Sequence, residues 1–480
     1  MIDINWGVFA PALILLIAAS LSLLLAVFNK NIKLSALISL TALVVSAGFN
    51  LALFNAGPGS SFDGQYLADT AAVGFNFVIL LATFLAILIS YDYLESRDLD
   101  HEEYYPLMLL SATGAMVMVA AGSMITLILG LEIMSLAVYV LAAWKQDNSA
   151  SEEAGMKYFL LGAFASAFLI YGIAMVFGAT GSFNYSQIAA AIAADGFDKA
   201  FYAVLGALLL LVGLGFKTAF FPFHQWAPDV YTGAPMPVTS FMSTVVKTAA
   251  FAALLRIAAS LLLGLPSIIV QVIAIMIALT MIVGNLGGLM QTGLKRMLAF
   301  SAVAHAGYLG LAVLAAKTTG IQAAIWYLTA YAIMNAGAFA VLSLIVDEDD
   351  QGDDIELLDG FGKSHPMLAV ALSIFLFSLA GFPLFAGFIG KIFVFQAALA
   401  QGYNVLAIIG IVSSLVAVVY YMRPVIAMYF KSENHKLSVN ASMPTMIAIS
   451  FAAVATILMG ILPGWWYSLF EIGQRVVAGG

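Results

Sequence analysis

The sequence predicts an all-α protein that crosses a membrane many times. Hydrophobic residues make up 63% of its 480 residues and charged residues only 9%, and its mean hydropathy is +1.03. A soluble domain carries about 25% charged residues, and an apolar stretch of roughly 20 residues spans a bilayer. Such stretches follow one another along the whole chain. We therefore expect one membrane domain, 1–480, embedded in a lipid bilayer, with no sizeable soluble part.

Composition also excludes several function classes. The chain has no cysteine, which excludes cysteine-ligated iron–sulfur clusters, thiolate zinc sites and disulfides. No two histidines have the i, i+4 spacing of a metal site, so we expect no metal and no cofactor in this chain. The pair Gly390-Lys391 lacks the rest of a phosphate-binding loop, which disfavours ATP-driven transport. No basic patch suggests a nucleic-acid partner.

Hydropathy divides the chain into about 14 predicted transmembrane helices. Their ranges are 7–28, 34–54, 71–93, 105–121, 124–144, 154–178, 201–232, 237–260, 266–289, 291–314, 320–346, 366–400, 404–429 and 443–470. The first basic residue is Lys30 and the first span lacks a basic n-region, so we expect no cleaved signal peptide. With the N-terminus outside, the inner connections or their margins hold Lys30, Lys33, Arg97, Lys145, Lys157, Lys295, Arg296, Lys363, Lys431 and Lys436, whereas the outer ones hold only Lys199, Lys317 and Arg475. This bias predicts that both termini lie outside.

Two predicted spans are too long and contain helix breakers. The seventh runs through 221–228, with Pro222 and Pro228, and the twelfth through Gly381-Phe382-Pro383. Proline removes a backbone donor and opens a helix, and paired broken spans in two halves of a chain indicate a transport site. The breaks lie five spans apart, so the second copy of a five-helix repeat would be inverted. The predicted regions are 1–104 (three N-terminal helices), 105–260 (repeat one), 266–429 (repeat two) and 443–480 (C-terminal helix).

Four ionisable residues interrupt apolar runs: Glu132, Lys217, Lys247 and Lys391. A charge at the centre of a bilayer costs roughly 3 kcal/mol or more, so such residues usually line an ion or proton path. We expect Glu132 and Lys217 to pair. At ~4 Å and an effective dielectric of ~20 their attraction is about 4 kcal/mol, and at twice that distance about half. The alternatives are a static ion pair and, for Lys247 and Lys391, side chains that extend to an interface.

Other polar residues are candidates for supporting roles. His305 is either a relay or a hydrogen-bonded core residue, and His224, in the first break, either shuttles protons or satisfies the opened backbone. Lys157 is either a relay or an ordinary flanking residue. We expect Arg256 and Arg423 to be anchors, Asp229 to cap a helix or loop, and the following residues to support bound water or helix packing: Ser135, Thr218, Thr244, Ser301 and Tyr308.

The segment 347–359 is strongly acidic. A charge run of this kind is usually a solvated face. The alternative is that it docks a basic element of a partner.

Several motifs together resemble the antiporter-like subunits of respiratory complex I, the proton-pumping NADH:quinone oxidoreductase. They are 130–136 (GLEIMSL), 156–164 (MKYFLLGAF), 215–217 (GFK), 222–231 (PFHQWAPDVY), 233–235 (GAP), 295–301 (KRMLAFS) and 381–383 (GFP). The resemblance covers nearly the whole chain. The lack of an obvious C-terminal lateral helix argues against the longest such subunit, and lysine rather than glutamate at 391 argues against the middle one.

The resemblance implies a fourteen-helix translocase subunit in a bacterial inner membrane. It implies that Glu132 and Lys217 form the input pair, that Lys247 is the central relay and Lys391 the output residue, with lateral passage through His305. It also implies that NADH, FMN, iron–sulfur clusters and quinone belong to neighbouring subunits, and that other antiporter-like subunits are among its partners. NADH as the electron donor rests on this analogy alone.

Three other functions compete with this interpretation. A subunit of a multisubunit sodium–proton antiporter would need an oxygen-rich cation site, whereas the deep residues here are mostly lysines. A structural membrane subunit would tolerate neutral residues at 217 and 247. A transporter of organic substrates would need a polar substrate cluster, which the sequence does not suggest.

Overall fold

The computed structural model describes residues 3–28, 30–194, 200–345, 353–432, 437, 439 and 441–464. The predicted last span is therefore followed only to residue 464. Residues 347–352 of the acidic segment lie outside the described residues, as do Lys199, Lys436 and Arg475.

The helices follow the predicted spans in order, and apolar sequence runs explain each of them. Those before the first break are α1 (Trp6–Phe28), α2 (Ile32–Ala56), α3 (Thr70–Glu95), α4 (Tyr104–Val119), α5 (Met124–Ala142), α6 (Ser149–Thr180), α7 (Tyr185–Ala194) and α8 (Ala200–Thr218). After it come α9 (Trp226–Gly233), α10 (Met236–Phe241), a π-helical turn (Met242–Val246), α11 (Lys247–Ser260), α12 (Ser267–Leu289), α13 (Leu294–Leu314) and α14 (Gly320–Ile345). The last are α15 (Phe361–Ser364), α16 (Pro366–Ala380), α17 (Ala386–Ala400), α18 (Asn404–Phe430) and α19 (Met443–Ile461).

The predicted fold class, an all-α polytopic membrane protein, is confirmed. Within the described residues, twelve helices are long and apolar enough to cross a membrane. The two other predicted spans correspond to α4, which has 16 residues, and to the pair α16 and α17, with 15 residues each. The total of fourteen spans therefore stays a prediction, as does the division into two inverted repeats.

Both predicted breaks are present. The first separates α8 from α9, and its freed backbone groups find partners: Trp226 Nε1 donates to the Phe216 carbonyl at 2.8 Å, and the Phe221 amide donates to Thr280 Oγ1 at 2.9 Å. The second separates α16 from α17, where Gly381 adopts a left-handed φ of 91°. Such freed groups survive inside a membrane only when protein or water bonds them, and here side chains do so at the first break.

Several small elements lie in segments predicted to be connections, among them α7 and one β-hairpin. Helix α7 has ten residues, which are too few for a span. Strands β1 (Gly59–Ser61) and β2 (Tyr66–Ala68) form an antiparallel hairpin between α2 and α3. Neither element changes the arrangement of the long helices.

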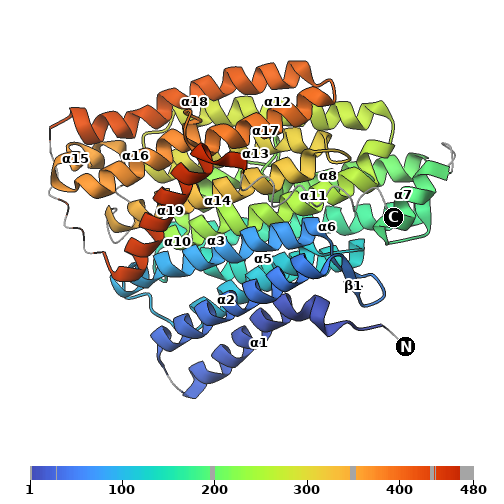
Figure 1. Cartoon of the computed structure of the whole chain (residues 1–480), viewed down its shortest axis with the longest axis horizontal. Helices are drawn as coiled ribbons and strands as arrows, with labels where there is room; N and C mark the ends of the chain where they lie inside the picture. Colours follow the sequence, from blue (N-terminus) through green and yellow to red (C-terminus); the bar gives the residue numbers. More distant parts are fainter. Residues whose placement is uncertain are drawn as a thin grey trace.

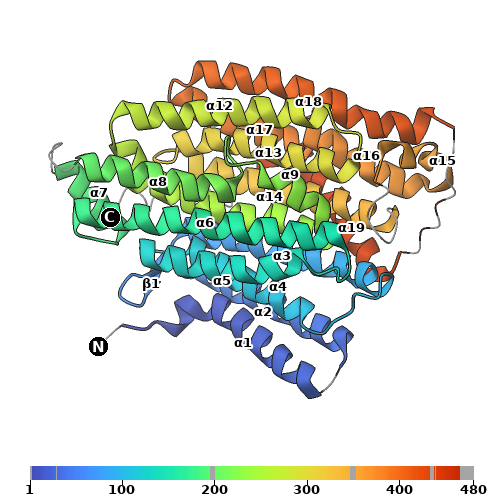
Figure 2. The same ribbon diagram turned by 180° about the vertical axis from the view of Figure 1, so that it is seen from behind.

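Most of the long helices lie side by side along the longest axis of the molecule (Figures 1 and 2), whereas α1 and α19 run at an angle to it (Figure 1). Helices α1 and α2 form one edge, and α12 and α18 form the opposite edge. Helices α13 and α14 lie between them and are buried along almost their whole length. Any polar side chain on these central helices must find its partner inside the protein, and this requirement shapes the site.

Candidate functional site

The three predicted lysines all lie inside the protein. Lys217 is on α8, Lys247 begins α11 and Lys391 is on α17, and their exposed fractions are 3%, 3% and 5%. Burying a charged group without a partner is costly. The contacts of each ammonium group therefore decide what the residue can do.

Glu132 and Lys217 do not form the predicted close pair. Among the described residues no ion pair within 4.0 Å joins them; Ser166 of α6 donates to Glu132 Oε1 at 2.7 Å, and Lys217 Nζ donates to the Tyr139 hydroxyl at 3.3 Å. Glu132 and Tyr139 are seven residues apart on α5, so they share one face of that helix. The charge of Glu132 still acts on Lys217 electrostatically. Tyr139 and Ser166 were missed in the sequence because isolated hydroxyl residues are common in helix packing.

Aromatic rings surround the Lys217 ammonium. It lies 5.1 Å from the centre of the Tyr139 ring, 4.9 Å from that of Tyr158 and 5.7 Å from that of Phe216. Cations are attracted to ring faces at such distances. Gly162 leaves room for Tyr139, because a Cβ there would lie 2.1 Å from the tyrosine hydroxyl. This explains why the motif at 156–164 contains a glycine opposite the lysine site.

Lys247 is held by a helix backbone. Its Nζ donates to the Ala302 carbonyl of α13 at 2.5 Å and lies 4.9 Å from the centre of the Tyr331 ring. The π-helical turn Met242–Val246 ends directly before it. Such turns are rare and occur frequently at functional sites. The ammonium does not extend to an interface, which argues against that alternative.

Lys391 turns back to the second break. Its Nζ donates to the Ala380 carbonyl at 2.7 Å, at the end of α16, and lies 5.0 Å from the centre of the Tyr308 ring. Carbonyl groups at a helix end have no partner within the helix, and they attract cations. Gly381 permits this contact, since a Cβ at its position would lie 2.8 Å from the lysine nitrogen. The extended, interface-seeking alternative does not fit this geometry either.

His305 lies within electrostatic range of both central lysines. The charges of Lys391 and Lys247 both act on its imidazole. Its Nδ1 lies 2.6 Å from the Tyr327 hydroxyl, and the Tyr421 hydroxyl lies 3.3 Å from Nε2. The imidazole is 1% exposed. Both ring nitrogens thus have a tyrosine hydroxyl as hydrogen-bond partner. This arrangement fits a hydrogen-bonded core residue and a proton relay equally well.

A second polar group connects the Lys391 side with α12 and α18. Asn285 of α12 donates to the Tyr308 hydroxyl at 2.9 Å and accepts from the Tyr420 hydroxyl at 3.2 Å. Asn285 was not among the residues predicted from the sequence, although an amide inside an otherwise apolar span is a usable signal. Also absent from that prediction were Tyr327, Tyr331, Tyr420 and Tyr421, because tyrosines at helical spacing usually read as core residues.

The candidate water-supporting residues behave differently from one another. Ser301 is hydrogen-bonded to Tyr421. Ser135, Thr218 and Thr244 instead donate to the carbonyl groups four residues earlier in their own helices, at 2.5, 2.8 and 2.7 Å. That bond is the ordinary way for such residues to satisfy themselves inside a helix, so the packing role fits these three.

The side chain of His224 does not satisfy the opened backbone of the first break, which was one of the two roles predicted for it. Trp226 and Thr280 bond the freed groups instead. The His224 ring stacks on Phe221, and among the described residues its buried Nδ1 has no hydrogen-bond partner. Thus the position leaves one polar atom of this imidazole without a protein partner.

Lys157 lies apart from the buried lysines, in a half-exposed ion cluster. Its Nζ contacts Glu153 at 2.6 Å and Asp229 at 2.8 Å, and Asp229 also accepts from Arg296 at 2.9 Å. Asp229 stands in the first turn of α9 and pairs with two cations, so its main role is not that of a cap. The flanking role predicted for Lys157 fits this position better than a relay.

The two arginines expected to be anchors bind protein groups. Arg256 makes a two-pronged contact with Asp69 at 2.7 and 2.8 Å and donates to the Val119 carbonyl at 2.9 Å. Arg423 donates to the Leu289 and Gln291 carbonyls, at 3.1 and 2.8 Å, beyond the end of α12. Both therefore join helices to one another.

The described end of the acidic segment packs against its own chain. Helix α13 follows Gly293, which has no side chain to cap it, and Asp353 supplies the cap: its Oδ2 accepts from the Lys295 amide at 2.7 Å. Lys295 itself is buried and its Nζ donates to the Ala234 carbonyl at 3.0 Å. Asp359 pairs with Lys431 at 3.2 Å. These residues are not simply solvated.

Replacing Asp353 by alanine is expected to weaken the start of α13 by about 1 kcal/mol, the usual cost of a lost cap. Asparagine at this position keeps the acceptor, so Asp353→Asn is the matched control. Hydrogen exchange of the first α13 amides in the assembled protein measures the effect. Equal exchange in both variants would contradict the capping role.

The same site predicts a pH response. Burial raises the pKa of the Asp353 carboxyl above its ordinary value. Because the folded-state pKa lies above the unfolded one, the group's contribution to stability is full below the unfolded pKa and is lost as pH rises through the folded pKa. Protection of the α13 start should therefore increase on acidification in the native protein and not in Asp353→Asn.

Within the part of the chain that the structure describes, no group of three or more histidines and carboxylates could hold a metal ion. The site is a set of buried bases held by carbonyls and rings. Hydrogen bonds link His305 to two tyrosines, whereas none links Lys217 to Lys247 among the described residues. Such a set can store and pass protons where water completes the path.

Comparisons with known proteins agree with this arrangement. Residues 121–417 match the family described as NADH:quinone oxidoreductase/Mrp antiporter, TM. NADH-quinone oxidoreductase subunit N of Trichlorobacter lovleyi is 41% identical, and the alignment covers 99% of this chain and 97% of that protein. Subunit N of Deinococcus radiodurans is 38% identical over 97% and 96% of the two chains.

Solved structures show the same fold. A chain of respiratory complex I from Thermus thermophilus with bound aureothin matches with a TM-score of 0.83 and 34% identity, covering 95% of this chain and 98% of that one. A chain of the archaeal membrane-bound sulfane sulfur reductase matches with a TM-score of 0.88 and 26% identity over 98% of both chains. On the family match and the identity to its relatives, the chain belongs to the NADH:quinone oxidoreductase/Mrp antiporter family of membrane proteins.

Proposed function

We propose that this chain is the proton-translocating subunit of an NADH:quinone oxidoreductase and that Glu132, Lys217, Lys247 and Lys391 carry the protons. The observation that carries the proposal is the burial of three lysines whose ammonium groups are held by carbonyls and aromatic rings, with no carboxylate in contact among the described residues. A lysine without a close counter-ion exchanges its proton more readily than one in an ion pair.

The input step involves Glu132 and Lys217. In this structure Lys217 donates to Tyr139 and not to Glu132, so Lys217 is in the unpaired arrangement. For any two opposite unit charges, a decrease in separation from about 8 Å to about 4 Å adds roughly 2 kcal/mol of attraction at an effective dielectric of about 20. Moving one charge against 100 mV costs about 2.3 kcal/mol. The two energies are comparable, so a modest movement on α5 suffices to load or release one proton.

The proton then passes to Lys247 and, through His305, to Lys391 and the outer side. His305 suits this step because the charges of both lysines act on its imidazole. Water must bridge Lys217 and Lys247, and it reprotonates the path from the inner side. Lys157 and His224 are weaker candidates: the first is half-exposed and the second makes no hydrogen bond to a lysine among the described residues.

Electron transfer takes place elsewhere in this scheme. NADH, FMN, iron–sulfur clusters and quinone are bound by partner subunits, and other antiporter-like membrane subunits adjoin this one. The chain lies in a bacterial inner membrane with both termini outside.

The test is proton pumping by the assembled complex carrying Lys247→Met, which keeps the length of the side chain and removes the charge. We expect pumping to fall by about tenfold or more, since a positioned proton carrier contributes about 10²–10⁴-fold. Lys363→Met, on the exposed turn α15, is the control. Unchanged pumping in an assembled Lys247→Met complex would favour a structural subunit, and sodium-dependent flux would favour the antiporter alternative.

A further inference from the structure

A groove of about 180 Å³ lies between α2 and α3, outside the lysine site. Its apolar walls are formed by Ala36, Leu37, Leu40, Ile87 and Leu88, together with Pro444 of α19. Leu37 is 61% exposed, so the groove opens at the apolar surface of the protein. Ligand pockets for drug-sized molecules occupy about 300–1,000 Å³. The groove has a smaller volume than such pockets, and it therefore fits a flexible hydrocarbon chain rather than a bulky ring system.

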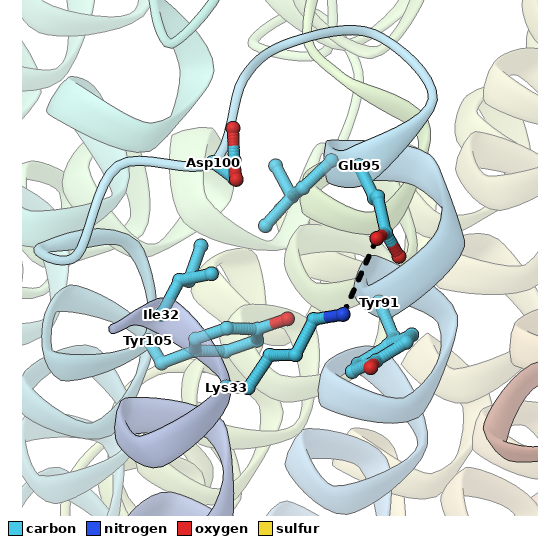
Figure 3. A pocket seen from close by; sticks show the side chains of 7 residues that line it. Ile32, Lys33, Tyr91, Glu95, Asp100 and Tyr105 are labelled. Carbon is cyan, nitrogen blue, oxygen red and sulfur yellow. Dashed lines mark hydrogen bonds and ion pairs between the residues drawn. The ribbon is translucent and has the colours of Figure 1, made fainter. Parts of the chain in front are cut away.

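One end of the groove is charged. Lys33 and Tyr91 line it and also line a smaller adjoining cavity with Glu95, Asp100 and Tyr105. Figure 3 shows Lys33 and Glu95 facing each other across this cavity, with Asp100 on the neighbouring loop. The Lys33 ammonium lies 3.3 Å from Glu95 Oε1, and both side chains are 59% exposed. So exposed a pair contributes little to stability and can open for a ligand.

The lining of the groove changes from charged to apolar along the helix axes. On α2, Lys33 stands in the first turn, and Leu37 and Leu40 follow it into the span. On α3, which runs the other way, Leu88 precedes Tyr91 and Glu95 toward the end of the helix. The groove thus begins with charges and tyrosines at one end of the spans and continues with aliphatic walls. A phospholipid has the same order, and tyrosines are typical of the headgroup level.

We propose that this groove binds one phospholipid whose headgroup carries both a phosphate and a free ammonium, that is, a phosphatidylethanolamine. Lys33 binds the phosphate, Glu95 and Asp100 bind the ammonium, and one acyl chain lies along Leu37 and Leu40. Two carboxylates against one lysine disfavour anionic headgroups. A trimethylated ammonium has no hydrogen to donate to the carboxylates, so phosphatidylcholine should bind more weakly.

The test uses the whole complex, stripped of lipid in detergent and titrated with deuterated phosphatidylethanolamine under native mass spectrometry. We expect Lys33→Ala to lower the affinity by about tenfold, the usual effect of a lost hydrogen bond to a charged group. Leu37→Trp, which obstructs the groove, should abolish binding. The control for Lys33→Ala is Lys30→Ala, at an exposed position near the same end of the membrane. The control for Leu37→Trp is Leu51→Trp, at an exposed position on the same helix. Neither Lys30 nor Leu51 lines the groove. An equal affinity for phosphatidylethanolamine in all four variants would overturn the proposal.

A second measurement distinguishes a lipid from a protein partner. A photo-crosslinking residue at Leu37 in native membranes is expected to form an adduct with the mass of a phosphatidylethanolamine. This experiment does not require the groove variants to assemble. An adduct with another subunit, or one with only phosphatidylglycerol, would overturn the proposal.

Discussion

Replacing Lys217 by alanine is expected to lower proton pumping and quinone-linked turnover of the assembled complex by about tenfold or more. Lys217 is 3% exposed and its ammonium is surrounded by Tyr139, Tyr158 and Phe216. Among the described residues no other cation lies over these rings, so its loss removes the first carrier of the path. Pumping is measured in membrane vesicles, and assembly is checked on a native gel.

Tyr139→Phe sharpens this experiment. It removes the hydroxyl that accepts from Lys217 at 3.3 Å and keeps the ring at 5.1 Å from the ammonium. We expect a smaller loss than for Lys217→Ala together with a shifted pH dependence of pumping, because the lysine keeps its charge but loses its hydrogen-bond partner. Wild-type pumping and wild-type pH dependence in both variants would contradict the proposed proton path through Glu132 and Lys217.

Replacing Gly381 by alanine is expected to lower pumping about as strongly, by displacing Lys391. The position has a φ of 91°, which costs roughly 1–2 kcal/mol for any residue with a Cβ. The added Cβ would also lie 2.8 Å from the Lys391 nitrogen, which donates to the neighbouring Ala380 carbonyl. The ammonium must then leave the carbonyl that holds it.

Gly402→Ala separates the two causes. Gly402 has a similar φ of 82°, but a Cβ there would meet no atom within 4 Å. If displacement of Lys391 matters, pumping falls in Gly381→Ala and not in Gly402→Ala, at comparable assembly on a native gel. An equal loss in the two variants would attribute the effect to backbone strain alone.

The second break illustrates how far local sequence reasoning reaches. Gly381 and Pro383 predicted an interruption, because one favours a left-handed backbone and the other removes a donor. The sequence did not indicate that the freed Ala380 carbonyl binds Lys391. Nine residues of chain lie between the glycine and the lysine, and only the way in which α16 and α17 meet at the break brings the two together.

The Glu132–Lys217 pair shows what local sequence reasoning does not predict. Both residues were correctly recognised as unusual within apolar spans, but opposite charge alone suggested a direct contact. The packing of α5 against α6 instead places Ser166 on Glu132, and Tyr139 of α5 contacts Lys217 of α8. Hydroxyl side chains give no signal in a hydropathy pattern, so these partners became visible only in the structure.

By itself the sequence determined the membrane class, the order of the helices, the two breaks and the identity of the buried lysines. These features depend on local properties: the length of apolar runs, the missing donor of proline and the cost of a charge in lipid. The tertiary structure alone decided which carbonyl, ring or hydroxyl holds each charge, that His305 lies between two tyrosines, and that Asp353 caps α13. Such contacts join residues far apart in the chain, and their geometry depends on how the helices pack rather than on any one segment.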